Sequence, residues 1–294
     1  MDTNVGVIGL GLMGTAITHR LLEAGYRPCI WNRTRDKADS LIAAGAVWSD
    51  CPLAECRRII ISLYSSDVVS EVLERWGQNL SATQIIIDTT TGDPAHSTQW
   101  ADRLRELGVE YLDAPISGSS EQTRRGEATA IVSGNRAAFD QCEDLWPVLA
   151  KRTFHVGVSG DAARMKLVSN LVLGLNRAAL AEGLVLAESL GLDLTTTLNV
   201  LQGSAAYSRQ MDTKGQKMIS EDFSVQARLS QHLKDVRLML ETAATTDIRL
   251  ALTETHRQLL EFAEQLGLGD MDNSAVIQAM RSRGEAESGE RKAE

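Results

Sequence analysis

Cysteine is scarce in this chain of 294 residues, which contains only Cys29, Cys51, Cys56 and Cys142. No two of them form a CxxC pair, and their density is far below that of a small disulfide-stapled protein. The five histidines form no HExxH motif or other cluster with the spacing of metal ligands. We therefore expect reduced cysteines that serve packing, and no metal site.

An excess of basic residues is also missing. The chain has 30 Lys and Arg against 39 Asp and Glu, a formal net charge of -9. Nucleic acids and anionic membrane surfaces need a basic partner surface, so the composition argues against both and favours a small-molecule substrate. The N-terminus enters an apolar run at Val5 without a basic leader segment, and no apolar run has the length of a membrane span, so we expect a cytoplasmic protein.

Short runs rich in β-branched residues recur through the first half of the chain. Segments with helical spacing lie between them, and this alternation predicts an α/β fold with a mostly parallel sheet. Continuous apolar runs of this kind are typical of strands buried on both faces. The expected strands cover residues 5–8, 29–31, 59–61, 85–87, 111–112, 130–132 and 154–156.

The composition changes after about Gly160, where long stretches rich in Ala, Leu, Glu and Met replace the β-branched runs. We expect residues 1–160 to form a dinucleotide-binding domain and residues 161–294 an all-helical substrate and oligomerisation domain. Asp161 is the expected cap of a long interdomain helix that ends before Gly191. Further helices are predicted at 194–202, 232–245 and 251–265, and the charged tail at 281–294 is expected to be disordered.

A glycine-rich segment follows the first expected strand and opens a helix. Its residues are Gly9, Leu10, Gly11, Leu12, Met13 and Gly14, the GxGxxG spacing of a dinucleotide fingerprint. In that motif the first glycine permits a tight turn, the second lets the backbone approach the pyrophosphate, and the third permits close helix packing. The segment therefore predicts a Rossmann-type, doubly wound sheet that binds a dinucleotide.

The end of the second expected strand bears on the choice of dinucleotide. An NAD enzyme usually places a carboxylate there for the ribose 2′-hydroxyl, whereas this chain has Asn32, Arg33 and Thr34. A guanidinium can meet the 2′-phosphate of NADP with charge-assisted hydrogen bonds, and the two neutral neighbours can add more. NADP is therefore the preferred cofactor, with NAD as the alternative.

Four further segments, together with the fingerprint, resemble the β-hydroxyacid dehydrogenase family, which includes 3-hydroxyisobutyrate dehydrogenases and glyoxylate or succinic semialdehyde reductases. The resemblance covers nearly the whole chain and implies an N-terminal Rossmann domain followed by an all-α domain. The segments lie at residues 88–94, 113–119, 160–170 and 234–238.

The resemblance implies a role for particular residues. Lys166 would be the proton-transfer residue, and Asn170, one helical turn later, would orient it or the substrate oxygen. The substrate carboxylate would be held near Ser117, Gly118 and Ser119, with Asp235 close by. Further cofactor contacts would come from Leu63, Tyr64, Thr91 and Lys234.

The resemblance has departures and leaves alternatives open. Tyr64 stands where most relatives have proline, Ala162 replaces a glycine, and Ser119 matches the glyoxylate and succinic semialdehyde reductase branch. An imine reductase has a similar fold but usually lacks the lysine found here, and phosphogluconate dehydrogenases have a much longer helical domain. A non-catalytic NADP sensor is a third possibility. Relatives form homodimers or homotetramers, which we also expect here.

Overall fold

The computed structural model describes residues 3–282. The chain divides into two units, Met1–Lys166 and Leu167–Glu294. The division lies inside helix α9 (Asp161–Ser189), which begins in the first unit and continues in the second.

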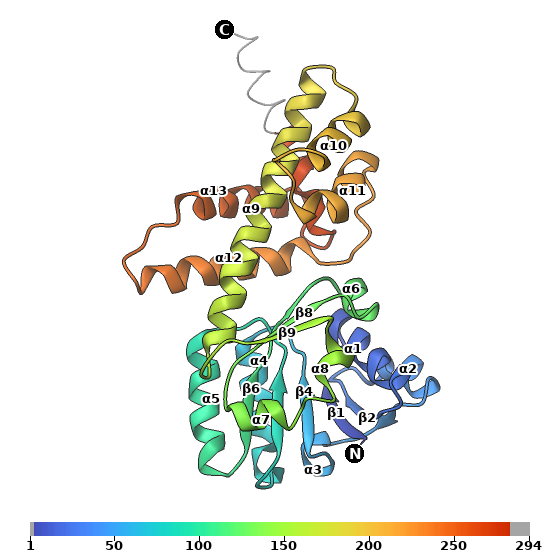
Figure 1. The fold of residues 1–294 in the computed structure, drawn as a ribbon, viewed down its shortest axis with the longest axis vertical. Helices are drawn as coiled ribbons and strands as arrows, with labels where there is room; N and C mark the ends of the chain where they lie inside the picture. The colour runs from blue at the N-terminus through green and yellow to red at the C-terminus, as the bar shows by residue number, and fades with distance from the viewer. Residues whose placement is uncertain (1–2, 283–294) are drawn as a thin grey trace. The chain divides into compact units, whose positions relative to one another are not determined.

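The first unit is built on a six-stranded sheet with the strand order β3-β2-β1-β4-β5-β6. Strands β2, β1, β4 and β6 of this sheet are labelled in Figure 1. Every neighbouring pair in it is parallel. The order reverses between β1 and β4, which is the topological switch point where doubly wound sheets bind ligands. The strands are β1 (Asn4–Ile8), β2 (Arg27–Trp31), β3 (Val47–Trp48), β4 (Arg58–Ile61), β5 (Ile85–Asp88) and β6 (Glu110–Asp113).

The central strands are buried on both faces, as their continuous apolar runs predict. Alternate residues enter opposite cores: Ile60 belongs to one apolar cluster, and Ile59 and Ile61 belong to the other. Helices provide the other side of both cores, as crossover connections require. The helices of this unit are α1 (Leu12–Glu23), α2 (Asp39–Ala43), α3 (Pro52–Glu55), α4 (Ser66–Trp76), α5 (Pro94–Glu106), α6 (Ser120–Arg124), α7 (Arg136–Asp140) and α8 (Trp146–Leu149).

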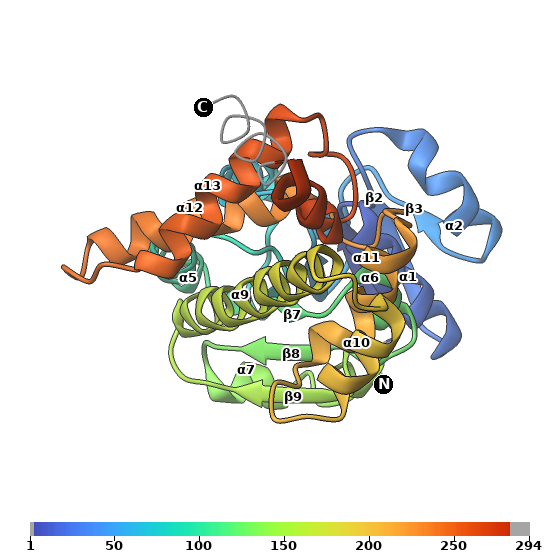
Figure 2. The same cartoon turned by 90° about the horizontal axis from the view of Figure 1, so that it is seen from above.

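Two of the expected strands do not join the main sheet. They are β8 (Thr129–Val132) and β9 (Arg152–His155), which form a separate three-stranded sheet with β7 (Ile116–Ser117), a strand that the sequence did not predict (Figure 2). In this sheet β7 is antiparallel to β8, and β8 is parallel to β9. The prediction that the last strand is buried on both faces is also wrong, because Phe154 is 52% exposed. An apolar run predicts a strand, but it does not say which sheet the strand joins.

The second unit is helical, as expected. Its described residues form no strand, and α12 packs along α13 (Figure 1). Its core gathers the apolar faces of several helices, with Leu184, Leu233 and Leu260 fully buried. Besides α9, the helices are α10 (Leu194–Gln202), a π-helical turn (Met211–Gly215), α11 (Gln216–Ser220), α12 (Leu229–Ala244), α13 (Ala251–Gln265) and a 3-10 turn (Asn273–Ala275).

Two expectations about chain segments need correction. Helix α9 does have the length and composition of a membrane span, with a mean hydropathy of 1.3 over its most apolar window, a test that core helices of soluble proteins also pass. Residue Arg281 is ordered, because its guanidinium pairs with Glu188 at 2.8 Å and with Glu221 at 2.6 Å. The rest of the tail expected to be disordered, from residue 283 onward, lies outside the described residues.

Candidate active site

The glycine-rich segment between β1 and α1 has the geometry of a phosphate-binding turn. Gly9 has φ of +100°, and a Cβ there would lie 2.2 Å from the carbonyl oxygen of Ser62. A Cβ at Gly14 would lie 1.8 Å from the carbonyl oxygen of Gly9. A Cβ at Gly11 would meet no atom within 4 Å, so the backbone there is open to a ligand. The first and third glycines are required by packing and the second leaves space, which is the division of roles expected of a dinucleotide fingerprint.

The start of helix α1 is suited to an anion. Its N-cap is Gly11, no side chain caps it, and its first turn carries no acidic residue. The first N–H groups of a helix have no partner within the helix, and the helix dipole adds positive potential. Leu10 lies in the core, Met13 is half-buried, and Leu12 is 49% exposed. The diphosphate of a dinucleotide fits this helix terminus and the open backbone of Gly11.

The three residues after β2 differ in their contacts. The side-chain oxygen of Asn32 accepts a hydrogen bond from the backbone N–H of Leu10 at 2.9 Å, and its amide nitrogen donates to the carbonyl of Thr34 at 2.8 Å. Asn32 thus ties the glycine-rich turn to the end of β2. Arg33 is exposed and forms no ion pair with any residue in 3–282.

The loops after β4 and β5 lie at the same edge of the sheet, because both strands are parallel to β1. The N–H of Leu63 donates to the hydroxyl of Thr90 at 3.1 Å, so these two loops are joined. Tyr64 is 58% exposed, and Thr91 is half-buried. The carboxyl edge of the sheet therefore carries these three predicted cofactor contacts, Leu63, Tyr64 and Thr91, in neighbouring loops.

Lys166 is the most informative of the predicted catalytic residues. It lies near the start of α9 and is only 6% exposed, although lysine is seldom buried. Its ammonium donates to the carbonyl oxygen of Ile116 at 2.8 Å. Ile116 directly precedes Ser117 and Gly118, so the structure brings the lysine beside the segment predicted to hold the substrate carboxylate.

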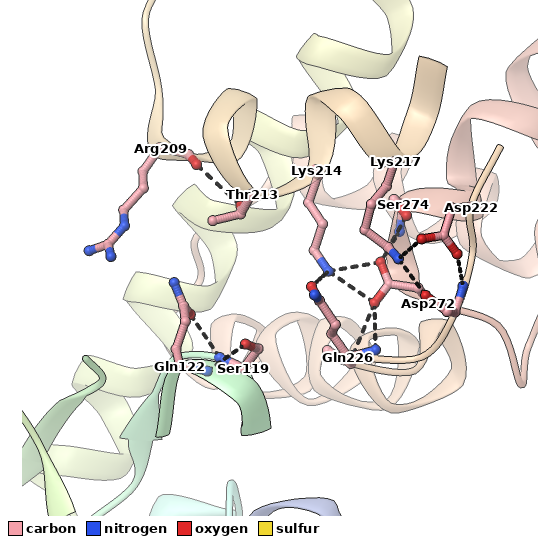
Figure 3. Close-up of polar contacts among 12 residues, drawn as sticks. Ser119, Gln122, Arg209, Thr213, Lys214, Lys217, Asp222, Gln226, Asp272 and Ser274 are labelled. Atoms are coloured by element: carbon pink, nitrogen blue, oxygen red, sulfur yellow. Dashed lines mark hydrogen bonds and ion pairs between the residues drawn. The ribbon is translucent and has the colours of Figure 1, made fainter. Parts of the chain in front are cut away.

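Ser119 is engaged in helix capping. Its hydroxyl accepts from the backbone N–H of Gln122 at 3.1 Å, and the Gln122 side chain accepts from the N–H of Ser119 at 2.9 Å (Figure 3). This reciprocal pair is a capping box that starts α6. The backbone N–H of Ser119 therefore already donates a hydrogen bond within the chain.

The first turn of α9 is held by two residues, Asp113 and Ser133, for which the sequence did not predict a capping role. Asp161 was the expected cap, but its carboxylate accepts instead from the N–H of Val158 at 3.0 Å. The carboxylate of Asp113, at the end of β6, accepts from the N–H of Ala163 at 2.7 Å. The hydroxyl of Ser133 accepts from the N–H of Ala162 at 3.0 Å. These caps come from segments remote in sequence, so no local pattern could reveal them.

Asp113 is also unusual as an acid. Burial and then the negative charge of Asp88 raise its pKa to about 7, although its hydrogen bonds from Ala163 and Ser133 act in the opposite direction. Asp88 lies opposite it in the register of β5 and β6, and burial raises the pKa of that carboxyl as well, with the hydroxyl of Tyr111 donating to it at 2.6 Å. Two buried carboxyls, those of Asp88 and Asp113, thus lie side by side, and Asp113 contacts the first turn of α9, the helix that carries Lys166.

In the second unit, Asn170 and Asp235 are brought together. The Asn170 amide donates to the Asp235 carboxylate at 3.1 Å, and both residues are buried. The ammonium of Lys234 lies 3.3 Å from the other oxygen of the same carboxylate. Asp235 therefore sets the orientation of the Asn170 amide.

Two family models together match nearly the whole chain. The NAD-binding domain of 6-phosphogluconate dehydrogenase matches residues 4–157, which is more than half of the chain. A second family, described as NAD-binding of NADP-dependent 3-hydroxyisobutyrate dehydrogenase, matches residues 160–280. The division between the two matches falls at the start of helix α9.

Individual relatives agree with these matches. Glyoxylate/succinic semialdehyde reductase 1 of Arabidopsis thaliana is 32% identical over 94% of this chain and 98% of its own. A solved 3-hydroxyisobutyrate dehydrogenase of Salmonella typhimurium is 26% identical, with a TM-score of 0.86 over 94% of this chain and 99% of its own. A structure titled Psf3 in complex with NADP+ and 2-OPP is 27% identical, with a TM-score of 0.87 over the same shares.

Proposed function

Because the chain belongs to the β-hydroxyacid dehydrogenase family, is an oxidoreductase of the hydroxyacid dehydrogenase type and has NAD(P)-binding domains, we propose that it reduces a short oxo-acid or semialdehyde with NADPH, or runs the reverse oxidation. The observation that carries this proposal is the buried ammonium of Lys166, 2.8 Å from the carbonyl oxygen of Ile116 and beside Ser117 and Gly118. A cation in that position can both attract a carboxylate substrate and move a proton.

Each residue then has a defined task. The hydroxyl of Ser117 and the backbone of Gly118 hold the substrate carboxylate. Lys166 protonates the carbonyl oxygen as it becomes a hydroxyl, and accepts the hydroxyl proton in the reverse direction. Asn170 orients the reacting oxygen, and Asp235 is a positioning residue that holds the Asn170 amide. When bound, the nicotinamide supplies or accepts the hydride.

The cofactor would be held along the carboxyl edge of the main sheet. The start of α1 and the backbone at Gly11 would hold the diphosphate, and Arg33 with Thr34 would bind the 2′-phosphate that distinguishes NADP. Leu63, Tyr64 and Thr91 would line the site further along the edge, and Lys234 would lie toward the nicotinamide.

The substrate class follows from the small number of polar groups at Ser117 and Gly118, which suit a single carboxylate. Glyoxylate and succinic semialdehyde are the first candidates, since the Arabidopsis thaliana relative is named for them. We further propose a cytoplasmic homodimer or homotetramer with no nucleic-acid or membrane partner.

The test is a comparison of the wild type with Lys166→Ala, in which NADPH and NADH oxidation is followed with both substrates. We expect turnover that prefers NADPH, and a loss in kcat of about 100-fold to 10,000-fold in the variant. Lys151→Ala, which removes an exposed lysine from the same unit, is the matched control and should keep full activity.

Each outcome has a clear meaning. Wild-type protein that binds NADPH without turnover on a broad panel of carbonyl acids would instead support a sensor. Turnover of cyclic imines but not of oxo-acids would support an imine reductase. Full activity in Lys166→Ala would remove this lysine from the mechanism.

A further inference from the structure

The interior of the second unit contains charged side chains that the proposed reaction does not use. Arg177 on α9 is 0% exposed, and the side chains of Lys214 and Asp272 are 7% and 0% exposed. Charged groups are rarely buried to this extent, because removing them from water is costly unless each finds an opposite charge and hydrogen bonds. The pairing of these three groups therefore decides whether the interior needs a further charged group to balance them.

Lys214 and Asp272 form one complete pair. The ammonium lies 2.8 and 2.9 Å from the two oxygens of the carboxylate (Figure 3). Burial raises the pKa of Asp272, but the charge of Lys214 and several hydrogen bonds lower it more, so the carboxylate is ionised. The Lys214 charge is thereby balanced.

The Asp272 carboxylate has no capacity left for a second cation. One oxygen also accepts from the N–H and the hydroxyl of Ser274, at 3.1 and 2.8 Å. The other also accepts from the N–H groups of Gln226 and Ala227, at 3.0 and 3.1 Å. With the ammonium included, each oxygen receives three donors, which fills the lone-pair sites of a carboxylate.

Arg177 is left without a partner of its own. None of its three guanidinium nitrogens has a hydrogen bond to any residue in 3–282. Burial lowers its pKa to about 10, while the charge of Asp272 acts in the opposite direction, so the side chain is still cationic at neutral pH. Among Arg177, Lys214 and Asp272, two cations therefore share one anion.

The nearby His256 does not change this balance. Burial, and then the charge of Arg177, lower the pKa of His256 to about 4, so its ring is neutral. The His256 ring lies 5.2 Å from that of His232, and both rings pack against Gly174 on the same helix as Arg177. Neutral imidazole supplies no negative charge to balance a guanidinium.

We propose that the Arg177 guanidinium binds a small monovalent anion, such as a halide or a planar oxyanion, inside the helical unit. Its fork of N–H groups matches such an ion, and the ion supplies the missing negative charge. A buried polar group without a partner within the protein commonly binds a water molecule or an ion, and the unbalanced positive charge of Arg177 favours an anion over water. This site is separate from the proposed reaction and stabilises the fold.

The first test measures the thermal unfolding of the full-length chain at constant ionic strength, while sodium gluconate is replaced by sodium chloride, bromide or nitrate. An anion that binds only the folded state raises its stability, so we expect the wild-type Tm to rise by about 3 °C once the anion is tenfold above its Kd. Arg177→Met should lose this rise, because the long apolar side chain removes the charge and keeps the volume. Arg249→Met, which removes an exposed arginine of the same unit, should keep it.

A second test needs no variant. Crystals of the wild type soaked in sodium bromide should show an anomalous bromide signal within hydrogen-bond reach of the Arg177 guanidinium. Ordered waters around Arg177 with no bromide signal would overturn the proposal. A Tm rise of equal size in wild type and Arg177→Met would overturn it as well, because the anion would then act elsewhere on the chain.

Discussion

Among the three residues after β2, Asn32 is committed to the fold and Arg33 is available to a ligand. Asn32 uses both ends of its amide within the chain, to Leu10 and to Thr34. Arg33 is exposed and forms no ion pair within the described part of the chain. Arg35, two residues later, stacks on the ring of Trp48 at 4.9 Å. Of the two arginines, Arg33 is therefore the one that we assign to the 2′-phosphate.

Replacing Arg33 tests this assignment. Arg33→Ser should raise the KM for NADPH by about 10-fold to 100-fold, since a hydrogen bond to a charged group contributes about 1.5–3 kcal/mol. The KM for NADH should stay nearly unchanged, because NADH lacks the 2′-phosphate. Steady-state kinetics with both cofactors gives the answer, and Arg35→Ser is the matched control. An equal rise for both cofactors would place Arg33 elsewhere on the dinucleotide.

At the scale of the element, helix α9 is the feature on which most of the proposed chemistry depends. Its first turn is capped by Asp113 and Ser133, and Lys166 follows on the same helix. Asp113 is thus a positioning residue for the lysine. Its buried carboxyl, raised to a pKa of about 7, also makes the stability of this unit depend on pH.

The direction of that dependence follows from proton binding. An aspartate carboxyl in water has a pKa of 3.8 and the Asp113 carboxyl has a pKa of about 7 in the fold, so between these values the folded state binds more protons than the unfolded state. Its contribution to stability is present below the lower value and is lost as the pH rises through the upper one. The free energy of unfolding should therefore fall by roughly 4 kcal/mol from this group across that window.

Asp113→Asn keeps the shape and an acceptor oxygen but removes the titration. We expect the variant to show a flatter dependence of unfolding free energy on pH between about 4 and 7, measured by urea denaturation at several pH values. Asp161→Asn removes a more exposed carboxylate from the first turn of α9, the turn that Asp113 caps, and is the control. The same slope in wild type and Asp113→Asn would show that this carboxyl is not the titrating group.

At the scale of the whole molecule, α9 presents apolar side chains to solvent. Met165, Val168 and Val172 are 46%, 58% and 52% exposed, at spacings that place them on one side of the helix. Apolar groups gathered on one face of a monomer commonly mark a protein interface. This face suits the homodimer or homotetramer that we propose.

Val172→Asp should therefore shift the chain to the monomer, because a carboxylate would be buried in the interface. Sedimentation velocity of wild type and variant measures this directly. Val200→Asp places a carboxylate at another exposed apolar residue, 63% exposed on α10, and should leave the assembly intact. A monomeric wild type would rule out the oligomer, and an unchanged variant would place the interface on another surface.

The sequence by itself determined the class of fold and much of its layout. Continuous apolar runs marked the strands at 59–61 and 85–87, since only strands buried on both faces are apolar at every position. The change to long stretches rich in Ala, Leu, Glu and Met predicted helices at 194–202 and 251–265, whose bounds agree with α10 and α13. Local signals of this kind succeed because they depend on neighbouring residues alone. The glycine fingerprint is local in the same way.

Only the tertiary structure decided which remote residues meet. The separate sheet of β7, β8 and β9, the caps of α9 by Asp113 and Ser133, and the carbonyl partner of Lys166 all join segments far apart in the chain. The same is true of Asp272, whose filled carboxylate leaves Arg177 without a counter-charge. The type of a residue determines which hydrogen bonds and charges its side chain can form. Whether the side chain finds a hydrogen-bond partner or a counter-charge depends on the groups that folding brings beside it.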